Sequence, residues 1–244
     1  MIIVERKELN GIPFLQVEQD SLKNEPLATV VYYHGFNGEK ESSLTISYKI
    51  AEKGLRVIIP DAPQHGERAI SEEAIEHGIN FWHIVLQAVE EVEQFKNYLK
   101  NESLILNDKL GLGGTSMGGV ITYASLKKYD WIKSAAVLMG TPYLTKRAER
   151  TISSPTDKTR AFLEQIKAVD ITKDLAALGE RSLFIWHGEK DEIVPVTDSR
   201  DFYSSLMNEQ VPEERLQFIE EKERIHNISK LSIKKTAEWF ASQL

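Results

Sequence analysis

The chain contains a serine whose neighbours are typical of an activated nucleophile. The stretch Gly114-Thr115-Ser116-Met117-Gly118 fits the pattern G-x-S-x-G. The residues before it predict a short buried strand and those after it predict a helix, so Ser116 stands on a sharp turn that exposes its hydroxyl. Gly114 and Gly118 suit this turn because a side chain at either position would collide with the nearby chain. Ser116 is therefore a candidate nucleophile.

A serine hydroxyl needs a base to accept its proton and an acid to orient that base. Asp191 lies just beyond the predicted strand 182–186, in a loop where Glu189 and Glu192 are its rivals. His226 follows the last predicted strand and precedes the last helix. The order Ser116, Asp191, His226 is the acyl-transfer order of one fold.

Short apolar runs alternate with helical patterns, which indicates an α/β fold with right-handed crossovers. Most runs are apolar on consecutive residues, as expected of parallel strands covered on both faces. The strands are predicted at 29–33, 56–60, 110–115, 135–139, 182–186 and 216–219. Residues 2–6 and 12–17 alternate more and are expected to pair antiparallel at one edge. Helices are predicted over 81–99 and 231–244, the latter capped by Ser229.

Composition excludes several classes of protein. A net charge of −7 with scattered basic residues argues against a nucleic-acid partner. The lack of cysteine excludes disulfides and thiolate metal sites. No apolar run approaches the ~18–20 residues of a membrane span, and the N-terminus is charged too early for a signal peptide. We therefore expect a cytoplasmic protein with no membrane partner.

With these motifs the chain resembles members of the α/β-hydrolase superfamily, and specifically bacterial serine esterases related to dienelactone hydrolases and prolyl-oligopeptidase catalytic domains. The resemblance rests on His34-Gly35-Phe36, Pro60-Asp61, Gly114–Gly119, His187–Pro195 and His226. It implies one domain over residues 1–244, with a mostly parallel eight-stranded sheet and helices on both faces. The long connection 141–181 is expected to form a small helical lid inserted in that domain.

The resemblance also implies roles for individual residues. Ser116 corresponds to the nucleophile, His226 to the general base and then acid, and Asp191 to the orienting carboxylate. The backbone N–H groups of Phe36 and Met117 would form the oxyanion hole. The implied activity is that of a serine carboxylesterase acting on small-molecule carboxylic esters, as a monomer or homodimer, with no cofactor and no metal.

Two departures from the family pattern bear on this interpretation. The loop His34-Gly35-Phe36-Asn37-Gly38 replaces the His-Gly-Gly-Gly of many lipases, which argues against a lipase. Arg224-Ile225 precedes His226, where many relatives have a glycine. The alternatives are a thioesterase or small-peptide hydrolase using the same triad, and a non-catalytic binding protein of the same fold.

Other residues have a structural interpretation beside a functional one. His34 and His187 each end a strand before a glycine and are expected to support the structure. His65 either shapes its loop or contacts substrate. The aromatic residues that either pack in the core or line an acyl pocket are Phe81, Trp82 and Tyr143. The residues that could form a metal site, but are better explained by a solvated helix, are Glu73, Glu76, His77 and His83.

Overall fold

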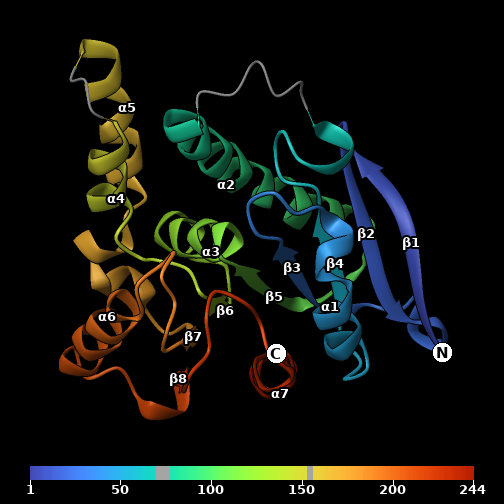
Figure 1. The fold of residues 1–244 in the computed structure, drawn as a ribbon. Coiled ribbons are helices and arrows are strands. Elements are labelled where there is room, and N and C mark those ends of the chain that lie inside the picture. The colour runs from blue at the N-terminus through green and yellow to red at the C-terminus, as the bar shows by residue number, and fades with distance from the viewer. Residues whose placement is uncertain (70–76, 153–155) are drawn as a thin grey trace.

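Strands that are apolar on consecutive residues form the centre of the molecule. The computed structural model describes residues 1–69, 77–152 and 156–244. In this part of the chain an eight-stranded sheet runs in the order β1-β2-β4-β3-β5-β6-β7-β8 (Figure 1). The strands are Ile2–Leu9 (β1), Ile12–Gln19 (β2), Leu27–Tyr33 (β3), Arg56–Pro60 (β4), Ile105–Thr115 (β5), Ser134–Leu138 (β6), Ser182–Gly188 (β7) and Leu216–Glu221 (β8).

The pairing confirms the predicted mixture of parallel and antiparallel strands. From β4 through β3, β5, β6 and β7 to β8 every neighbouring pair is parallel. The hairpin β1–β2 is antiparallel and joins β4 antiparallel at one edge. The carboxyl ends of β3, β5, β7 and β8 therefore meet at one edge of the sheet, where open α/β sheets carry their sites.

Helices cover both faces of the sheet (Figure 1). They are Leu44–Ala51 (α1), His77–Asn101 (α2), Met117–Lys128 (α3), Leu144–Thr151 (α4), Asp157–Ala168 (α5), Val196–Asn208 (α6) and Lys230–Gln243 (α7). Helices α1 and α7 pack together on one face. Helices α2, α3 and α6 share the core of the other face. The Ser229 side chain accepts from Ser232 N and caps α7, as predicted.

Strand β2 is more buried than its alternating sequence suggests. Its polar residues are covered because Arg56 of β4 lies beneath them without solvent exposure. The Arg56 guanidinium donates to the Glu18 carboxylate at 2.5 Å, and Gln16 donates to the same carboxylate at 2.6 Å. The polar side chains of β2 therefore form a buried ion pair instead of facing solvent, as would be expected of a strand in an edge hairpin.

The described residues between 141 and 181 pack their apolar side chains into the same core as α2 and α3. This segment contains α4, α5 and two short 3-10 helices, Ile171–Lys173 and Leu175–Leu178. Helix α4 packs against both α5 and α2. In Figure 1, α4 and α5 lie to the left of α3. Among the described helices, none is both long and apolar enough to span a bilayer.

Candidate active site

Ser116 occupies the turn between β5 and α3 in a strained conformation. Strand β5 ends at Thr115 and α3 begins at Met117, which leaves Ser116 alone between them. Its backbone has φ 55° and ψ −111°, a region that residues other than glycine rarely adopt. The N–H of Ser116 donates to Leu138 O at 2.8 Å, and its carbonyl accepts from Val120 N at 3.1 Å. These bonds to β6 and α3 hold the serine in this conformation.

The glycines on either side of Ser116 allow this turn. A Cβ at Gly114 would lie 2.3 Å from the carbonyl carbon of Gly118. A Cβ at Gly118 would lie 2.1 Å from the carbonyl oxygen of Tyr33, at the end of β3. Both contacts are with backbone, which cannot rotate away. The collision expected from the sequence is therefore present at both positions.

Ser116, His226 and Asp191 form a continuous hydrogen-bonded chain. His226 Nε2 lies 2.9 Å from Ser116 Oγ, and His226 Nδ1 lies 2.6 Å from Asp191 Oδ2. Because an ionised carboxylate only accepts, Nδ1–H is the donor to Asp191 and Nε2 is left to accept the serine proton. The three residues come from loops after β5, β8 and β7. This arrangement can remove a proton from Ser116 as its oxygen attacks a carbonyl carbon.

Asp191 is held in the ionised form by the groups around it. Burial raises its pKa, but hydrogen bonds from His187 and His226 and from Val194 N outweigh burial and bring the pKa well below its usual range. Asp191 Oδ1 accepts from Ile193 N at 3.0 Å and from Val194 N at 2.9 Å. Its carboxylate therefore stays charged and oriented toward His226.

His187 contacts the triad, beyond the structural role expected from the sequence. The side chain is fully buried at the end of β7, and Nε2 lies 3.2 Å from Asp191 Oδ2 and 2.8 Å from Val194 O. Nε2 must carry the proton, since Val194 O only accepts. Nδ1 then accepts from the Ser199 hydroxyl at 2.7 Å. A signal for this contact existed in the sequence, because His187 and Asp191 are four residues apart around a tight turn.

The two N–H groups predicted for the oxyanion hole are free to donate. Phe36 N and Met117 N make no hydrogen bond within the described residues. Met117 N belongs to the first turn of α3, where helical N–H groups have no partner inside the helix. The loop that carries Phe36 passes close to Ser116, since a Cβ at Gly35 would lie 3.6 Å from Ser116 Cβ. Their role in catalysis remains a prediction.

His34 fixes the loop that carries Phe36. Its Nδ1–H donates to Gly35 O at 2.8 Å, and its Nε2 accepts from Ala62 N at 3.1 Å. This pattern requires a neutral ring, and burial lowers the pKa of His34 to about 4. The loop after β3 is thus attached to the loop after β4 by a neutral histidine, which agrees with the structural role expected of His34.

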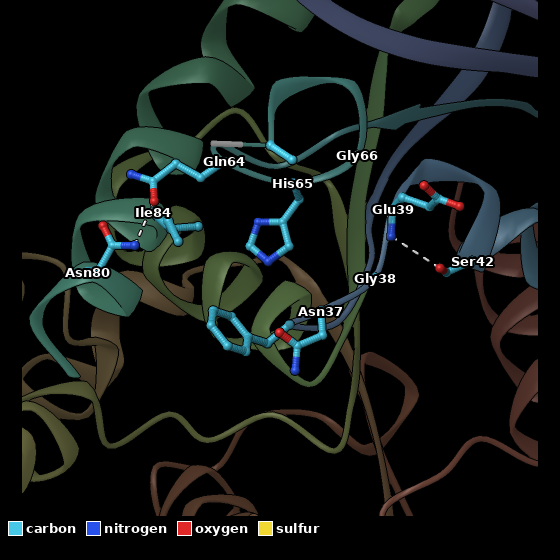
Figure 2. A pocket seen from close by; sticks show the side chains of 11 residues that line it. Asn37, Gly38, Glu39, Ser42, Gln64, His65, Gly66, Asn80 and Ile84 are labelled. Carbon is cyan, nitrogen blue, oxygen red and sulfur yellow. Dashed lines mark hydrogen bonds between the residues drawn. The ribbon is translucent and has the colours of Figure 1, made fainter. Parts of the chain in front are cut away.

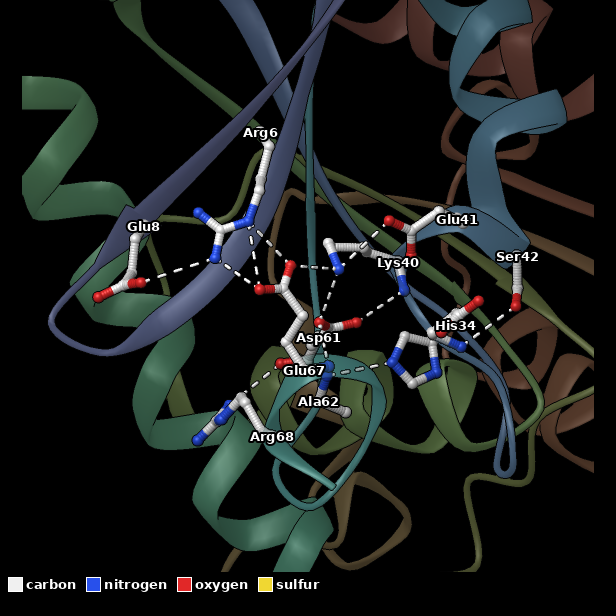
Figure 3. Close-up of polar contacts among 11 residues, drawn as sticks. Arg6, Glu8, His34, Lys40, Glu41, Ser42, Asp61, Ala62, Glu67 and Arg68 are labelled. Carbon is white, nitrogen blue, oxygen red and sulfur yellow. Dashed lines mark hydrogen bonds and ion pairs between the residues drawn. The ribbon is translucent and has the colours of Figure 1, made fainter. Parts of the chain in front are cut away.

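A buried ion pair, not anticipated from the sequence, reinforces the same attachment (Figure 3). The Asp61 carboxylate accepts from Lys40 N at 2.9 Å, from Lys40 Nζ at 3.0 Å and from Glu67 N at 3.0 Å. Burial alone would lower the pKa of Lys40, but hydrogen bonds to Glu67 and Asp61 raise it well above its ordinary value. Lys40 and Asp61 are 21 residues apart, so sequence spacing gives no signal of their contact.

A pocket of about 390 Å³ opens beside Ser116. Its apolar walls come from the Phe36 loop, α2, α3 and the Asp191 loop, and α4 adds two arginines. The lining residues are Phe36, Phe81, Trp82, Ser116, Met117, Val120, Thr141, Arg147, Arg150, Thr151, Ile193 and Val194. Phe81 and Trp82 thus line the pocket, whereas Tyr143 does not. Arg147 is paired with Asp198 at 2.8 Å.

The described residues contain no group of three or more acidic or histidine side chains placed to hold a metal ion. Of the four residues considered for such a site, Glu73 and Glu76 lie outside the described residues, as does the side chain of His77. The ring of His83 stacks on Phe162 of α5, with ring centroids 4.1 Å apart. His83 therefore contributes to packing between α2 and α5.

Comparisons with known proteins identify a family and several relatives. Residues 20–218 match the model of the Dienelactone hydrolase family. The chain is 35% identical to YitV of Bacillus subtilis strain 168, named as a proposed esterase, over 100% of both chains. It is 34% identical to Esterase YjfP of Escherichia coli strain K12, over 84% of this chain and 85% of that one. The crystal structure of TT1662 from Thermus thermophilus shares the fold, with a TM-score of 0.81 and 21% identity over 100% of this chain and 98% of that chain.

Proposed function

Because this chain belongs to the dienelactone hydrolase family, we propose that it is a serine esterase that hydrolyses small carboxylic esters through an acyl-enzyme. One observation carries the proposal. A serine on a strained turn is hydrogen-bonded to a histidine, and that histidine to a buried carboxylate, at 2.9 and 2.6 Å. The two esterase-named relatives are similar over most of their length.

The geometry suggests the following acylation step. Ser116 Oγ attacks the ester carbonyl carbon while His226 Nε2 takes the serine proton. Asp191 stabilises the imidazolium that forms through its bond to Nδ1. The carbonyl oxygen becomes an oxyanion and accepts from Phe36 N and Met117 N, where each such donor contributes ~10²–10³ in turnover. The C–O bond then breaks, and His226 returns its proton to the departing alcohol.

Deacylation repeats these steps with water as the nucleophile and Ser116 as the leaving group. Water attacks the acyl carbon, His226 takes its proton, and the second tetrahedral intermediate collapses. Ser116 regains its proton and the carboxylic acid leaves. The protein groups suffice for each proton transfer, so we propose that no cofactor takes part. We further propose that 141–181 acts as a lid whose helix α4 limits the acyl group, and that the protein works in the cytoplasm as a monomer or homodimer.

The test is a substrate series measured with the wild-type protein and Ser116→Ala. We expect p-nitrophenyl acetate and butyrate to give a burst of nitrophenol followed by slower turnover, and turnover to fall once the acyl chain is too long for the pocket of about 390 Å³. Ser116→Ala should abolish the burst and the turnover. Acetyl-CoA and dipeptide amides in the same series test the thioesterase and peptidase alternatives. Turnover of those substrates without turnover of any oxygen ester would contradict the proposal.

A further inference from the structure

A second cavity, of about 510 Å³, is lined by Phe36 but not by Ser116, and Figure 2 shows the side chains around it. Phe36 lines both this cavity and the pocket beside the nucleophile. The remaining walls come from the loop 37–42, the loop 64–69 and the start of α2. Its volume lies within the range typical of small-molecule sites. Phe36 is therefore the residue past which a ligand held at Ser116 would have to reach to enter this cavity.

The side chain at its centre is a buried histidine with one unused nitrogen. His65 is 7% exposed, and its Nδ1–H donates to Pro63 O at 2.8 Å. In the neutral ring Nε2 is then an acceptor, and it has no hydrogen-bond partner within the described residues. The ring packs against His34 and Phe36, with centroids 5.2 and 5.3 Å apart. A ligand that donates to Nε2 would thus lie against the loop that carries the oxyanion donor.

Most of the described residues that line this cavity are polar, and none of them is a lysine or an arginine. Figure 2 shows Gln64 and Asn80 on one side of the ring and Glu39 and Ser42 on the other. Asn80 Nδ2 donates to Gln64 Oε1 at 2.6 Å, which leaves the Gln64 amide N–H groups for a ligand. The Glu39 carboxylate offers further acceptors. The cavity therefore presents acceptors and donors together.

The donors and acceptors that line the cavity favour some classes of ligand over others. An anionic group would meet Glu39 with no lysine or arginine in the lining to compensate it. An alkyl chain would leave His65 Nε2 and the Gln64 amide without partners and would displace the water that could otherwise bond them, which is unfavourable. A hydroxyl group both donates and accepts, so neighbouring hydroxyls on a short carbon chain satisfy both kinds of group. The apolar surfaces of Phe36 and Ile84 suit the C–H faces of such a chain.

We propose that this cavity is a subsite for a neutral, hydroxyl-bearing alcohol, such as the polyol part of a monoacylated glycerol or sugar. The inference rests on the proposed esterase function and names its substrate class. The acyl group stays bonded to Ser116 after the alcohol has left, so the mostly apolar pocket beside Ser116 is assigned to the acyl group. The polar cavity beyond Phe36 is assigned to the alcohol. His65 Nε2 accepts a hydrogen bond from a hydroxyl of this alcohol.

The test uses two esters with the same acid and the same three-carbon alcohol skeleton. Glyceryl monoacetate carries two free hydroxyls and propyl acetate carries none, and a pH-stat measures hydrolysis of both. We expect kcat/KM of the wild-type protein to favour glyceryl monoacetate about tenfold, mainly through KM, as one or two net hydrogen bonds allow. His65→Leu and Asn80→Leu should bring this ratio close to one.

Controls separate the subsite from folding and from the esterase function. Asn97→Leu makes the same change at an exposed position of α2 outside both cavities and should keep the wild-type ratio. If His65→Leu does not fold, Asn80→Leu carries the test, because Asn80 is half-buried at the start of α2. Hydrolysis of neither ester would overturn the proposed function and the subsite with it. Equal kcat/KM for both esters in the wild type, or a ratio unchanged in Asn80→Leu, would overturn the subsite alone.

Discussion

His187 and His226 contact the same oxygen atom, Oδ2 of Asp191, at 3.2 and 2.6 Å. His226 reaches it from the loop after β8 and also contacts Ser116. His187 reaches it from the end of β7, and its position is fixed by Ser199 and by Val194 O. The carboxylate is thus clamped between one histidine that can carry protons and one whose hydrogen bonds are all internal. His187 is a positioning residue, because it acts on Ser116 only through Asp191 and His226.

Replacing His187 should lower turnover more than substrate binding. His187→Leu removes the N–H that orients Asp191, and losing a hydrogen bond to a charged group predicts a fall in kcat of about tenfold to a hundredfold with KM little changed. His187→Gln can place an amide N–H near the position of Nε2 and should recover much of kcat. Steady-state kinetics on p-nitrophenyl acetate check this. Equal losses in the Leu and Gln variants, with matched melting temperatures, would contradict the positioning role.

The stability of the protein should fall as pH decreases from about 6.5 to about 4. Burial lowers the pKa of His34 to about 4, whereas an unfolded histidine has a pKa of about 6.5. Between these values the unfolded chain takes up a proton that folded His34 refuses, so acid favours unfolding. Below pH 4 the full loss from this group is about 3 kcal/mol, because folding lowers the pKa of His34 from about 6.5 to about 4.

Urea denaturation at pH 7 and pH 5 measures this effect. The free energy of unfolding should depend less on pH in His34→Gln than in the wild type, because glutamine does not titrate. The absolute stability of the variant is not the readout, since other hydrogen bonds change as well. The same slope against pH in both proteins would show that His34 is not held neutral.

Lys40 should contribute far more to stability than an exposed lysine. Lys40→Met leaves the buried Asp61 carboxylate without its ammonium partner, and breaking a buried pair in this way costs about 3 kcal/mol. The control is Lys49→Met, which breaks an exposed pair with Glu52 and should cost less than about 0.5 kcal/mol. Urea denaturation compares the two variants. Similar small losses would mean that the pair does not hold the Phe36 loop to the loop after β4.

The parts of the site that follow from sequence are those carried by local patterns. The turn around Ser116 is encoded by two glycines at which any Cβ would collide with backbone, and its strand and helix are adjacent in the chain. Asp191 and His226 follow strands whose apolar runs are easy to recognise. Parallel strands bring their carboxyl ends together, so the sequence predicts the three residues as partners without any knowledge of their distances.

The parts of the site that the sequence does not predict are contacts between segments that lie far apart in the chain. The pairing of Lys40 with Asp61 depends on how the loops after β3 and β4 are folded against each other. Arg147 and Arg150 reach the pocket from α4, which packs against α2 and α5, an arrangement that helical spacing alone does not specify. For His65 the sequence leaves open whether it shapes a loop or contacts substrate. The structure shows that it packs on the Phe36 loop and lines a cavity, and its contact with substrate stays a proposal.

The most direct measurement of the central claim is covalent labelling of Ser116. A fluorophosphonate reacts with a serine only when a neighbouring base activates the hydroxyl and donors stabilise the developing oxyanion. We expect one label per chain by intact-protein mass spectrometry, located in the peptide that contains Ser116. We also expect no label in Ser116→Ala and much slower labelling in His226→Ala. Equal labelling of the wild type and Ser116→Ala, or a label on another residue, would contradict the assignment of Ser116 as the nucleophile.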